Sequence, residues 1–87
     1  MEIQIDRHTL ERAEERGTYA DEIKDVVLNG IVIPAKYGKR AKAKVYEFKR
    51  YRHNKYYDQK RIEVVYLEEE GKLITVTVYV FYGKWEE

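Results

Sequence analysis

The sequence predicts an α+β domain in which two N-terminal helices pack on one face of an antiparallel sheet. One observation is an uncharged stretch, residues 73–82, that is almost entirely β-branched or aromatic. A second is a pair of helical patterns near the N-terminus, and a third is a series of alternating segments before the long strand. The predicted order is β-α-α followed by three or four strands. With 87 residues, we expect a single domain spanning 1–87.

The long strand, residues 73–82, is expected to have one buried and one open face. Successive side chains of a strand point to opposite faces, so even and odd positions separate. The even positions are uniformly aliphatic and are expected in the core: Ile74, Val76, Val78 and Val80. The odd positions carry hydroxyl or aromatic side chains and are expected on the open face: Thr75, Thr77, Tyr79 and Phe81.

The N-terminal segment predicts a short strand and a first helix. Isoleucines alternate with polar residues at 3–5, which indicates a strand at an edge or paired with the long one. Asp6 is a suitable N-cap for a helix over residues 7–16, whose apolar positions are Leu10 and Ala13. Gly17 marks the C-terminal end of this helix.

A second helix is predicted directly after the first. Thr18 and Asp21 approximate a capping box, and Asn29 with Gly30 ends the helical pattern. The apolar stripe of this helix, which we expect in the core, consists of Ile23, Val26 and Val27.

The remaining chain predicts strands separated by turns. Residues 31–33 are β-branched, and Pro34 restricts this strand to an edge or an end. Residues 37–42 contain a glycine and several cations and are predicted as a loop. A strand is then expected over residues 44–51. Its core side holds Tyr46 and Phe48, and its open side holds Glu47 and Lys49.

The last predicted hairpin precedes the long strand. Residues 53–55 form a turn, and the next strand begins near residue 56 or 61 and ends at 67. Its inward residues are expected to be Ile62, Val64 and Tyr66.

Composition argues against several classes of function. The chain has no cysteine and only two histidines without metal-ligand spacing, so we expect no disulfide, metal site or cofactor. The longest apolar run is ten residues, too short for a membrane span, and the N-terminus lacks the layout of a signal peptide. We therefore expect a soluble, cytoplasmic protein.

The charges are segregated although the net charge is only +1. Residues 36–61 carry eleven Lys and Arg against two acidic residues, a balance of +9, and six aromatic residues lie among them. Basic segments interleaved with aromatics are typical of nucleic-acid binding. The alternatives are a solvated lysine-rich hairpin and a patch that docks an acidic protein. The residues expected to bind nucleic acid are Arg16, Lys39, Arg40, Lys42, Lys49, Arg50 and Arg52.

A cationic stripe is predicted on the first helix. His8, Arg12 and Arg16 are spaced at i, i+4 and i+8, so they share one side of the helix beside the apolar positions. RNA hydrolysis without a metal needs proton transfer and cations beside the phosphorus, which this set can supply. A solvated helix face with ordinary ion pairs is the alternative.

A second candidate cluster lies on the predicted open face of the sheet. Carboxylates, hydroxyls and a lysine could meet there as an acid/base site, and the alternative is that they simply face water. The residues involved are Glu47, Lys49, Glu63, Thr75, Thr77 and Tyr79.

Nearly the whole chain resembles a small prokaryotic family of unknown function that shares the RelE/ParE/BrnT-like toxin fold. That fold is grouped with barnase-like and colicin-like ribonucleases. The resemblance is carried by HTLERAEERGTYADEIKDVVLNG, KVYEF and RIEVVYLEEEGKLITVTVY, with a His-x3-Arg-x3-Arg-Gly signature starting at His8 and the TVTVY strand at residues 75–79. Two departures are Thr18, where an aliphatic residue is usual, and the longer, more basic segment 51–60.

The resemblance implies a RelE-like fold and a metal-independent endoribonuclease of a toxin-antitoxin system, with RNA as substrate and an antitoxin as partner. The catalytic residues implied by the matching stretches, together with the helix stripe, are His8, Arg12, Lys44, Thr77 and Tyr79. In this hypothesis His8 transfers a proton, the cations stabilise the phosphorane, and the hydroxyls position the substrate. The alternatives are a non-catalytic RNA- or DNA-binding module and a protein-interaction domain that docks an acidic partner.

Overall fold

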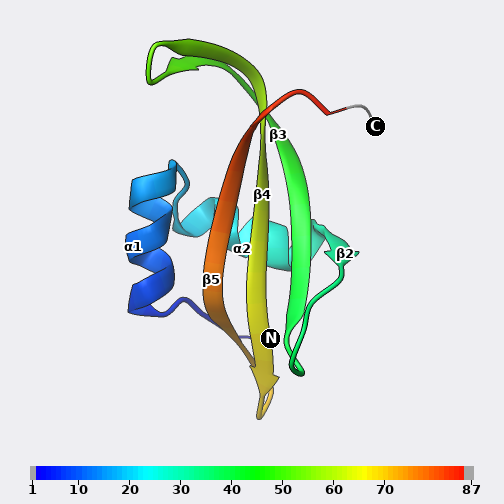
Figure 1. Ribbon diagram of the computed structural model, residues 1–87. Helices are drawn as coiled ribbons and strands as arrows, with labels where there is room; N and C mark the ends of the chain where they lie inside the picture. The colour runs from blue at the N-terminus through cyan, green and yellow to red at the C-terminus, as the bar shows by residue number, and fades with distance from the viewer. Residues whose placement is uncertain (1, 86–87) are drawn as a thin grey trace.

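Two helices and a five-stranded sheet form the described part of the chain, residues 2–85 of the computed structural model (Figure 1). The elements are β1 (Glu2–Gln4), α1 (Arg7–Arg16), α2 (Ala20–Asn29), β2 (Ile31–Ile33), β3 (Arg40–Arg52), β4 (Lys55–Glu69) and β5 (Lys72–Gly83). The sheet order is β1-β5-β4-β3-β2. The predicted α+β class and the order β-α-α followed by four strands are confirmed.

The sheet is mixed, which corrects the expectation of a purely antiparallel one. β1 pairs in parallel with β5, from Glu2 opposite Lys72 to Gln4 opposite Ile74. The other three pairings are antiparallel. Strands joined by a tight turn pair antiparallel. β1 and β5 are separated by the rest of the chain, so they can pair in either direction.

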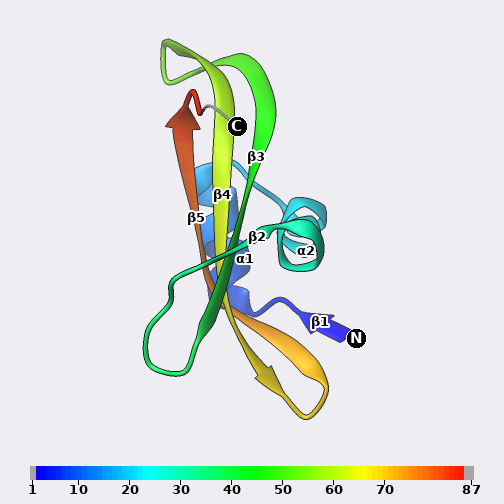
Figure 2. The same ribbon diagram turned by 90° about the vertical axis from the view of Figure 1, so that its right-hand side faces the viewer.

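The core lies between the helices and one face of the sheet. The sheet contributes Ile62, Val64 and Val78, all with 0% exposure, and Tyr66. The helices contribute Ala13, Ile23, Val26 and Val27. The predicted stripe of α2 and the predicted inward residues of β4 are therefore confirmed. Figure 1 shows α2 running across the strands and α1 alongside β5, and Figure 2 shows α2 end-on beside one face of the sheet.

A β-bulge divides the long strand into two parts. Val65 pairs with Thr77 but Tyr66 pairs with Thr75, so Val76 is the extra residue on β5. A bulge shifts the alternation of faces. Thr75 is therefore buried toward the helices together with Val78, and the prediction that Ile74 shares their face is wrong.

The first helix begins and ends where the sequence predicts, but its buried side differs. Asp6 accepts a hydrogen bond from the Thr9 amide at 3.0 Å, and Gly17 adopts a left-handed conformation with φ of 91°. Thr9 is fully buried, whereas Leu10 is 45% exposed and does not belong to the core as expected. The reason is a hydroxyl contact: Thr9 Oγ1 lies 2.9 Å from Thr75 Oγ1 on β5.

The predicted capping box of α2 does not form. Tyr19 is the N-cap and makes no side-chain capping bond. The hydroxyl of Thr18 instead donates to the Glu22 carboxylate at 2.9 Å. The Glu22 carboxylate is also paired with Lys60, a buried cation of the sheet. Because the Thr18 hydroxyl binds this carboxylate, it does not cap the helix amides.

The central hairpin is longer at both ends than predicted. β3 begins at Arg40, so residues 40–42, expected in a loop, pair with β2 and β4. At the other end β3 and β4 continue past the end of β5, where Gly83 lies opposite Gln59. We call residues 48–58 the hairpin arm. It turns at His53 and Asn54, which both have positive φ, and bends toward the side of α1 (Figure 1).

Candidate functional site

The start of α1 is fastened to β5 by a network of hydroxyls. The Asp6 amide donates to Thr75 Oγ1 at 3.2 Å, and the Asp6 carboxylate accepts hydrogen bonds from Thr9. Burial alone raises the pKa of Asp6, but the hydrogen bonds from Thr9 and Thr75 outweigh it and hold that pKa below its usual value. The helix therefore runs along β5 from a fixed starting point.

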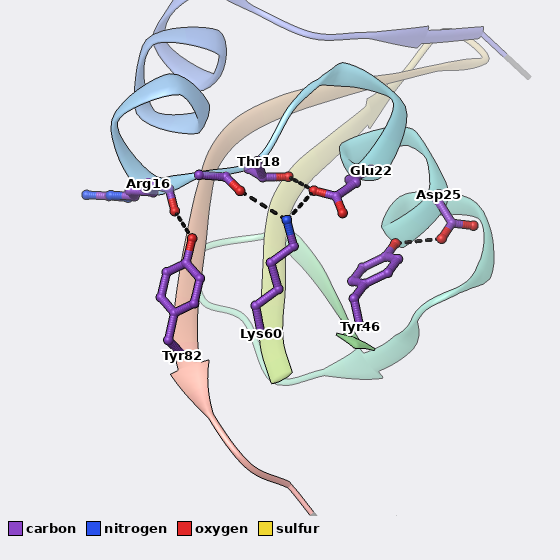
Figure 3. Close-up of polar contacts among 8 residues, drawn as sticks. Arg16, Thr18, Glu22, Asp25, Tyr46, Lys60 and Tyr82 are labelled. Carbon is purple, nitrogen blue, oxygen red and sulfur yellow. Dashed lines mark hydrogen bonds and ion pairs between the residues drawn. The ribbon is translucent and has the colours of Figure 1, made fainter. Parts of the chain in front are cut away.

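The end of α1 is held by side chains from three strands. Arg52 donates to the Glu15 carbonyl at 3.0 Å, Tyr82 to the Arg16 carbonyl at 2.6 Å, and Lys60 to the Gly17 carbonyl at 3.0 Å. Figure 3 shows the last two contacts. Cations favour helix C-termini because the last carbonyls lack partners and carry partial negative charge. We call Arg52, Lys60 and Tyr82 the C-terminal clamp.

Gly17 is required where the clamp meets the helix. Its φ of 91° disfavours any residue with a side chain, and a Cβ there would lie 2.2 Å from the Tyr82 hydroxyl. The glycine of the signature thus allows the helix to end in contact with the sheet.

Arg16 connects the helix stripe to the open face of the sheet. Its Nη1 donates to the Val78 carbonyl at 2.6 Å, and its guanidinium carbon lies 5.2 Å from the centroid of the Tyr79 ring. β1 pairs with β5 only as far as Ile74, so the edge of β5 beyond it has no neighbouring strand among the described residues. Tyr79 points to the opposite face from Val78, so Arg16 reaches around this edge.

Five of the residues predicted from the sequence belong to α1 and β5, the two elements that meet at this edge. We call them the β5 edge site: His8, Arg12, Arg16, Thr77 and Tyr79. His8 is exposed, one helical turn before Arg12. Arg12 pairs with Glu15 at 2.5 Å on the protein surface. The arrangement can present an imidazole and guanidinium groups to an anionic ligand.

Lys44, predicted to act with these residues, lies elsewhere. It pairs with Ile62 and so faces α2, where its Nζ lies 2.6 Å from Asp25. Tyr46, which faces the core as expected, donates to the same carboxylate at 2.5 Å. The hydrogen bond from Lys44 is the main cause that holds the pKa of Asp25 well below its usual range. Burial, followed by the Asp25 contact, raises the pKa of Tyr46.

A pocket of about 400 Å³ lies where β2 begins beside β3. Lys44 and Arg61 line it, together with Trp85 and Ile31. Both cations are already paired, Lys44 with Asp25 and Arg61 with Glu63. The pocket therefore presents no unpaired cation to a ligand, and it lies away from the β5 edge site.

The buried ion pair between Lys60 and Glu22 was not predicted from the sequence. The two side chains are 5% and 12% exposed and lie 2.7 Å apart (Figure 3). Thr18 completes the coordination of Glu22 at 2.9 Å. The signal was the position of Lys60, which shares the parity of the inward residues 62, 64 and 66 and therefore points to the core.

The basic segment does not form one surface. Lys42 donates to the Val27 carbonyl at 2.9 Å on the helix-covered face of the sheet, and Arg52 belongs to the C-terminal clamp. Lys39 and Arg40 lie by the β2–β3 loop, at the opposite end from the hairpin arm (Figure 1). The arm itself exposes Lys49, Arg50 and Lys55. The predicted nucleic-acid residues are thus distributed over both ends of a molecule 42 Å long.

The open-face cluster is assembled only in part. Tyr79 lies opposite Glu63, and Thr77 lies opposite Val65 on the same face. Glu63 is paired with Arg61 at 3.0 Å. Glu47 lies 3.4 Å from Gln59 and 3.6 Å from Lys49, nearer the arm. Thr75, expected on this face, is buried on the other because of the bulge at Val76.

Searches for a metal cluster and a membrane-spanning helix gave no candidate within residues 2–85. No group of three or more His, Cys, Asp or Glu side chains is arranged to hold a metal ion there. No helix of that part is long and apolar enough to cross a bilayer.

Comparison with known proteins adds one finding. A family model described as a domain of unknown function (DUF4258) matches residues 5–80, which include both helices and most of the sheet. No curated protein and no solved structure matches the chain significantly. By the extent of the family match, the chain belongs to the DUF4258 family.

Proposed function

We propose that the protein is a toxin-like, metal-independent endoribonuclease with a RelE-like arrangement of its helices and sheet. The observation that supports this best is the position of Arg16, which joins the stripe on α1 to Tyr79 around the free edge of β5. The stripe and the strand therefore border one accessible surface, which can take a phosphodiester. A cytoplasmic RNA would be the substrate, and a cognate antitoxin would be the protein partner.

In the proposed reaction the ribose 2′-oxygen attacks phosphorus and the bond from phosphorus to the 5′-oxygen breaks. His8 either removes the 2′-hydroxyl proton or delivers a proton to the leaving oxygen, and water exchanges the other proton. Arg12 and Arg16 stabilise the charge on the phosphorane. A guanidinium has five donors, so Arg16 retains donors for phosphate while one binds the Val78 carbonyl. Thr77 and Tyr79 position the nucleotide.

Lys44 has no role in this reaction because it faces α2 and neutralises Asp25. Arg16, which the sequence hypothesis gave both to RNA binding and to stabilising the phosphorane with Arg12 and Lys44, keeps that role without Lys44. Residues of α1 and of the adjoining edge of β5 can contact a single phosphate, whereas Lys44 lies on β3, two strands away from β5 and on the opposite face from Tyr79.

The test is RNA cleavage by the purified protein in the presence of a chelator. We expect cleavage to continue without divalent metal and to leave a 2′,3′-cyclic phosphate on the upstream fragment. His8→Ala should lower cleavage about 10²-fold or more per folded molecule, the range typical of a general acid or base. His53→Ala is the matched control, because His53 is the second histidine of the chain and lies in the arm turn. Equal activity of both variants would remove His8 from the mechanism.

The second candidate function is a nucleic-acid-binding module without catalysis. The observation that favours it is the hairpin arm, which exposes Lys49, Arg50 and Lys55 beyond the end of β5. This alternative predicts binding of RNA without cleavage. Induced expression in a bacterial host separates the two: growth arrest with cleaved RNA ends supports the enzyme, and arrest that His8→Ala does not relieve contradicts it.

A further inference from the structure

The hairpin arm contains two groups of aromatic side chains with different surroundings. Phe48 and Tyr57 pack on Tyr82 of β5, with ring centroids 5.2 and 5.4 Å away. Tyr51 and Tyr56 contact each other instead, with centroids 5.5 Å apart and planes at 72°. The first group packs the arm against β5, whereas the second group lies beyond the core.

Tyr51 and Tyr56 form an exposed pair near the tip of the arm. They lie directly opposite each other on β3 and β4 and are 73% and 46% exposed. Strand propensity accounts for aromatic residues in a hairpin, and their mutual contact orients both rings. The exposed parts of both rings remain available to a ligand with a π-system of its own.

Three exposed cations belong to the same arm as the pair. Arg50 and Lys55 alternate with Tyr51 and Tyr56 and so point to the other face of the two-stranded arm, where Arg50 lies 4.7 Å from the Phe48 ring centroid and Lys55 lies 5.6 Å from that of Tyr57. Lys49 is 68% exposed in its side chain and lies 3.6 Å from Glu47. Asp58 is the only acidic residue between positions 48 and 58. Positive charge beside exposed rings is complementary to a chain that alternates phosphates and bases.

We propose that the hairpin arm binds single-stranded RNA by stacking bases on Tyr51 and Tyr56, with phosphates on Lys49, Arg50 and Lys55. A duplex keeps its bases stacked on one another, so only a single strand can offer a base face to these rings. The inference rests on the proposed function, from which it takes RNA as the ligand. It adds that this RNA is single-stranded.

The C-terminal clamp relates the arm to the proposed catalytic residues. Arg52, at the end of β3 in the arm, donates to the Glu15 carbonyl at the end of α1. Arg16 follows Glu15 directly and reaches the β5 edge. The arm and the cationic end of the edge site are thus joined by a direct contact, and His8 lies about 12 Å further along the helix at 1.5 Å per residue.

The experiment measures binding with cleavage removed. In a His8→Ala background, fluorescein-labelled single-stranded RNA of 12 nucleotides is titrated by anisotropy, alongside the same strand in a duplex. The single strand should bind at least tenfold more tightly. Replacing Tyr51 and Tyr56 by Ala should weaken it about tenfold or more, whereas replacing both by Phe should preserve binding because phenylalanine also stacks.

Tyr37→Ala is the matched control. Tyr37 is 89% exposed and has Lys39 over its ring at 5.8 Å, but it lies in the β2–β3 loop away from the arm. It should bind RNA as the His8→Ala parent does. Melting curves of all variants should coincide, since none of the substituted rings is buried.

Three results would overturn the inference. They are equal affinity for single strand and duplex, equal binding by the double Ala variant and Tyr37→Ala, and binding of polyglutamate in place of RNA. The last would assign the arm to an acidic protein. Stacking on the tyrosines without cleavage by the protein with His8 intact would uphold the inference and reject the enzyme, so the two proposals fail separately.

Discussion

Lys60 is a charged residue at a core position of a strand, and its contacts explain why the fold accepts it. Its Nζ binds both the Glu22 carboxylate and the Gly17 carbonyl, at 2.7 and 3.0 Å. A buried charge is tolerated when it is paired and its donors are satisfied. Lys60 thus holds α2 and the end of α1 to β4 at once.

Removing Lys60 should strongly destabilise the protein. Lys60→Ala leaves the Glu22 carboxylate buried without its cation, and breaking such pairs costs about 3–5 kcal/mol. Urea unfolding monitored by circular dichroism measures the loss. Lys49→Ala is the control, because Lys49 is exposed on the same hairpin and should change the free energy of unfolding by less than about 0.5 kcal/mol. Similar losses in both variants would show that Lys60 is not buried.

Asp25 should make stability depend on pH. Its pKa in the folded state is lowered, so its contribution is present above the unfolded value of about 3.9 and is lost as the pH falls through the folded-state pKa. Asp25→Asn should therefore be less stable than the parent at pH 7, and the difference should narrow below about pH 4. Chemical unfolding over a pH series tests this. Asp21→Asn, exposed on the same helix, is the control, and a gap that is constant with pH would contradict the assignment.

Single residues also show why part of the core escaped sequence analysis. Leu10 is apolar and was expected inside, yet Thr9 is buried in its place. The choice depends on Thr75, which lies 66 positions away and whose hydroxyl donates to that of Thr9. A local hydrophobic pattern cannot indicate a contact between residues so far apart in the chain.

Among the elements, β5 was predicted in position but not in the orientation of all its side chains. Its bounds extend the expected stretch by one residue at each end. The bulge at Val76 reverses the alternation, and nothing in the local pattern of β-branched residues indicates where an extra residue sits. The inward assignments after the bulge, Val78 and Val80, agree with the structure, whereas Ile74 before it does not.

The two faces of β5 can be compared with one substitution placed on each. Val78→Asp would bury a carboxylate among aliphatic side chains, at a cost of several kcal/mol, comparable with the whole stability of a small domain. We expect loss of cooperative unfolding. Phe81→Asp, at a position 46% exposed on the opposite face, should retain it. A thermal melt of each variant decides, and a normal transition for Val78→Asp would reverse the face assignment.

At the scale of the whole molecule, the charge distribution is what the sequence could not disclose. Eleven cations lie within residues 36–61. The strand register places several of them on the helix-covered face of the sheet, and the length of the hairpin separates the others. The catalytic set divides for the same reason, because Lys44 and Tyr79 belong to opposite faces. Residue types and elements were therefore predictable, and the grouping of side chains depended on pairings distant in the chain.

RNA binding should depend on salt through a few phosphate contacts and not through all eleven cations. Three contacts by the arm and one at the β5 edge site give a slope of about −3 in the logarithm of affinity against the logarithm of salt concentration. Eleven contacts would give about −8. Anisotropy titrations at several salt concentrations measure the slope.

Charge reversal at the two ends of the molecule tests the same point. Lys49→Glu with Lys55→Glu should abolish most binding, whereas Lys36→Glu with Lys39→Glu, at the far end, should leave it nearly unchanged. Equal losses of affinity in the two double variants would indicate that RNA contacts one basic surface extending over both ends of the molecule.

The parallel pairing of β1 with β5 has a consequence for protein synthesis. Glu2 pairs with Lys72, and the Asp6 amide binds Thr75, 69 positions later. The segment that carries His8 and Arg12 is therefore translated well before the strand that it contacts. A nascent chain cannot assemble the β5 edge site until β5 has been made. An enzyme that attacks RNA would in this way remain inactive beside its own messenger until β5 has left the ribosome.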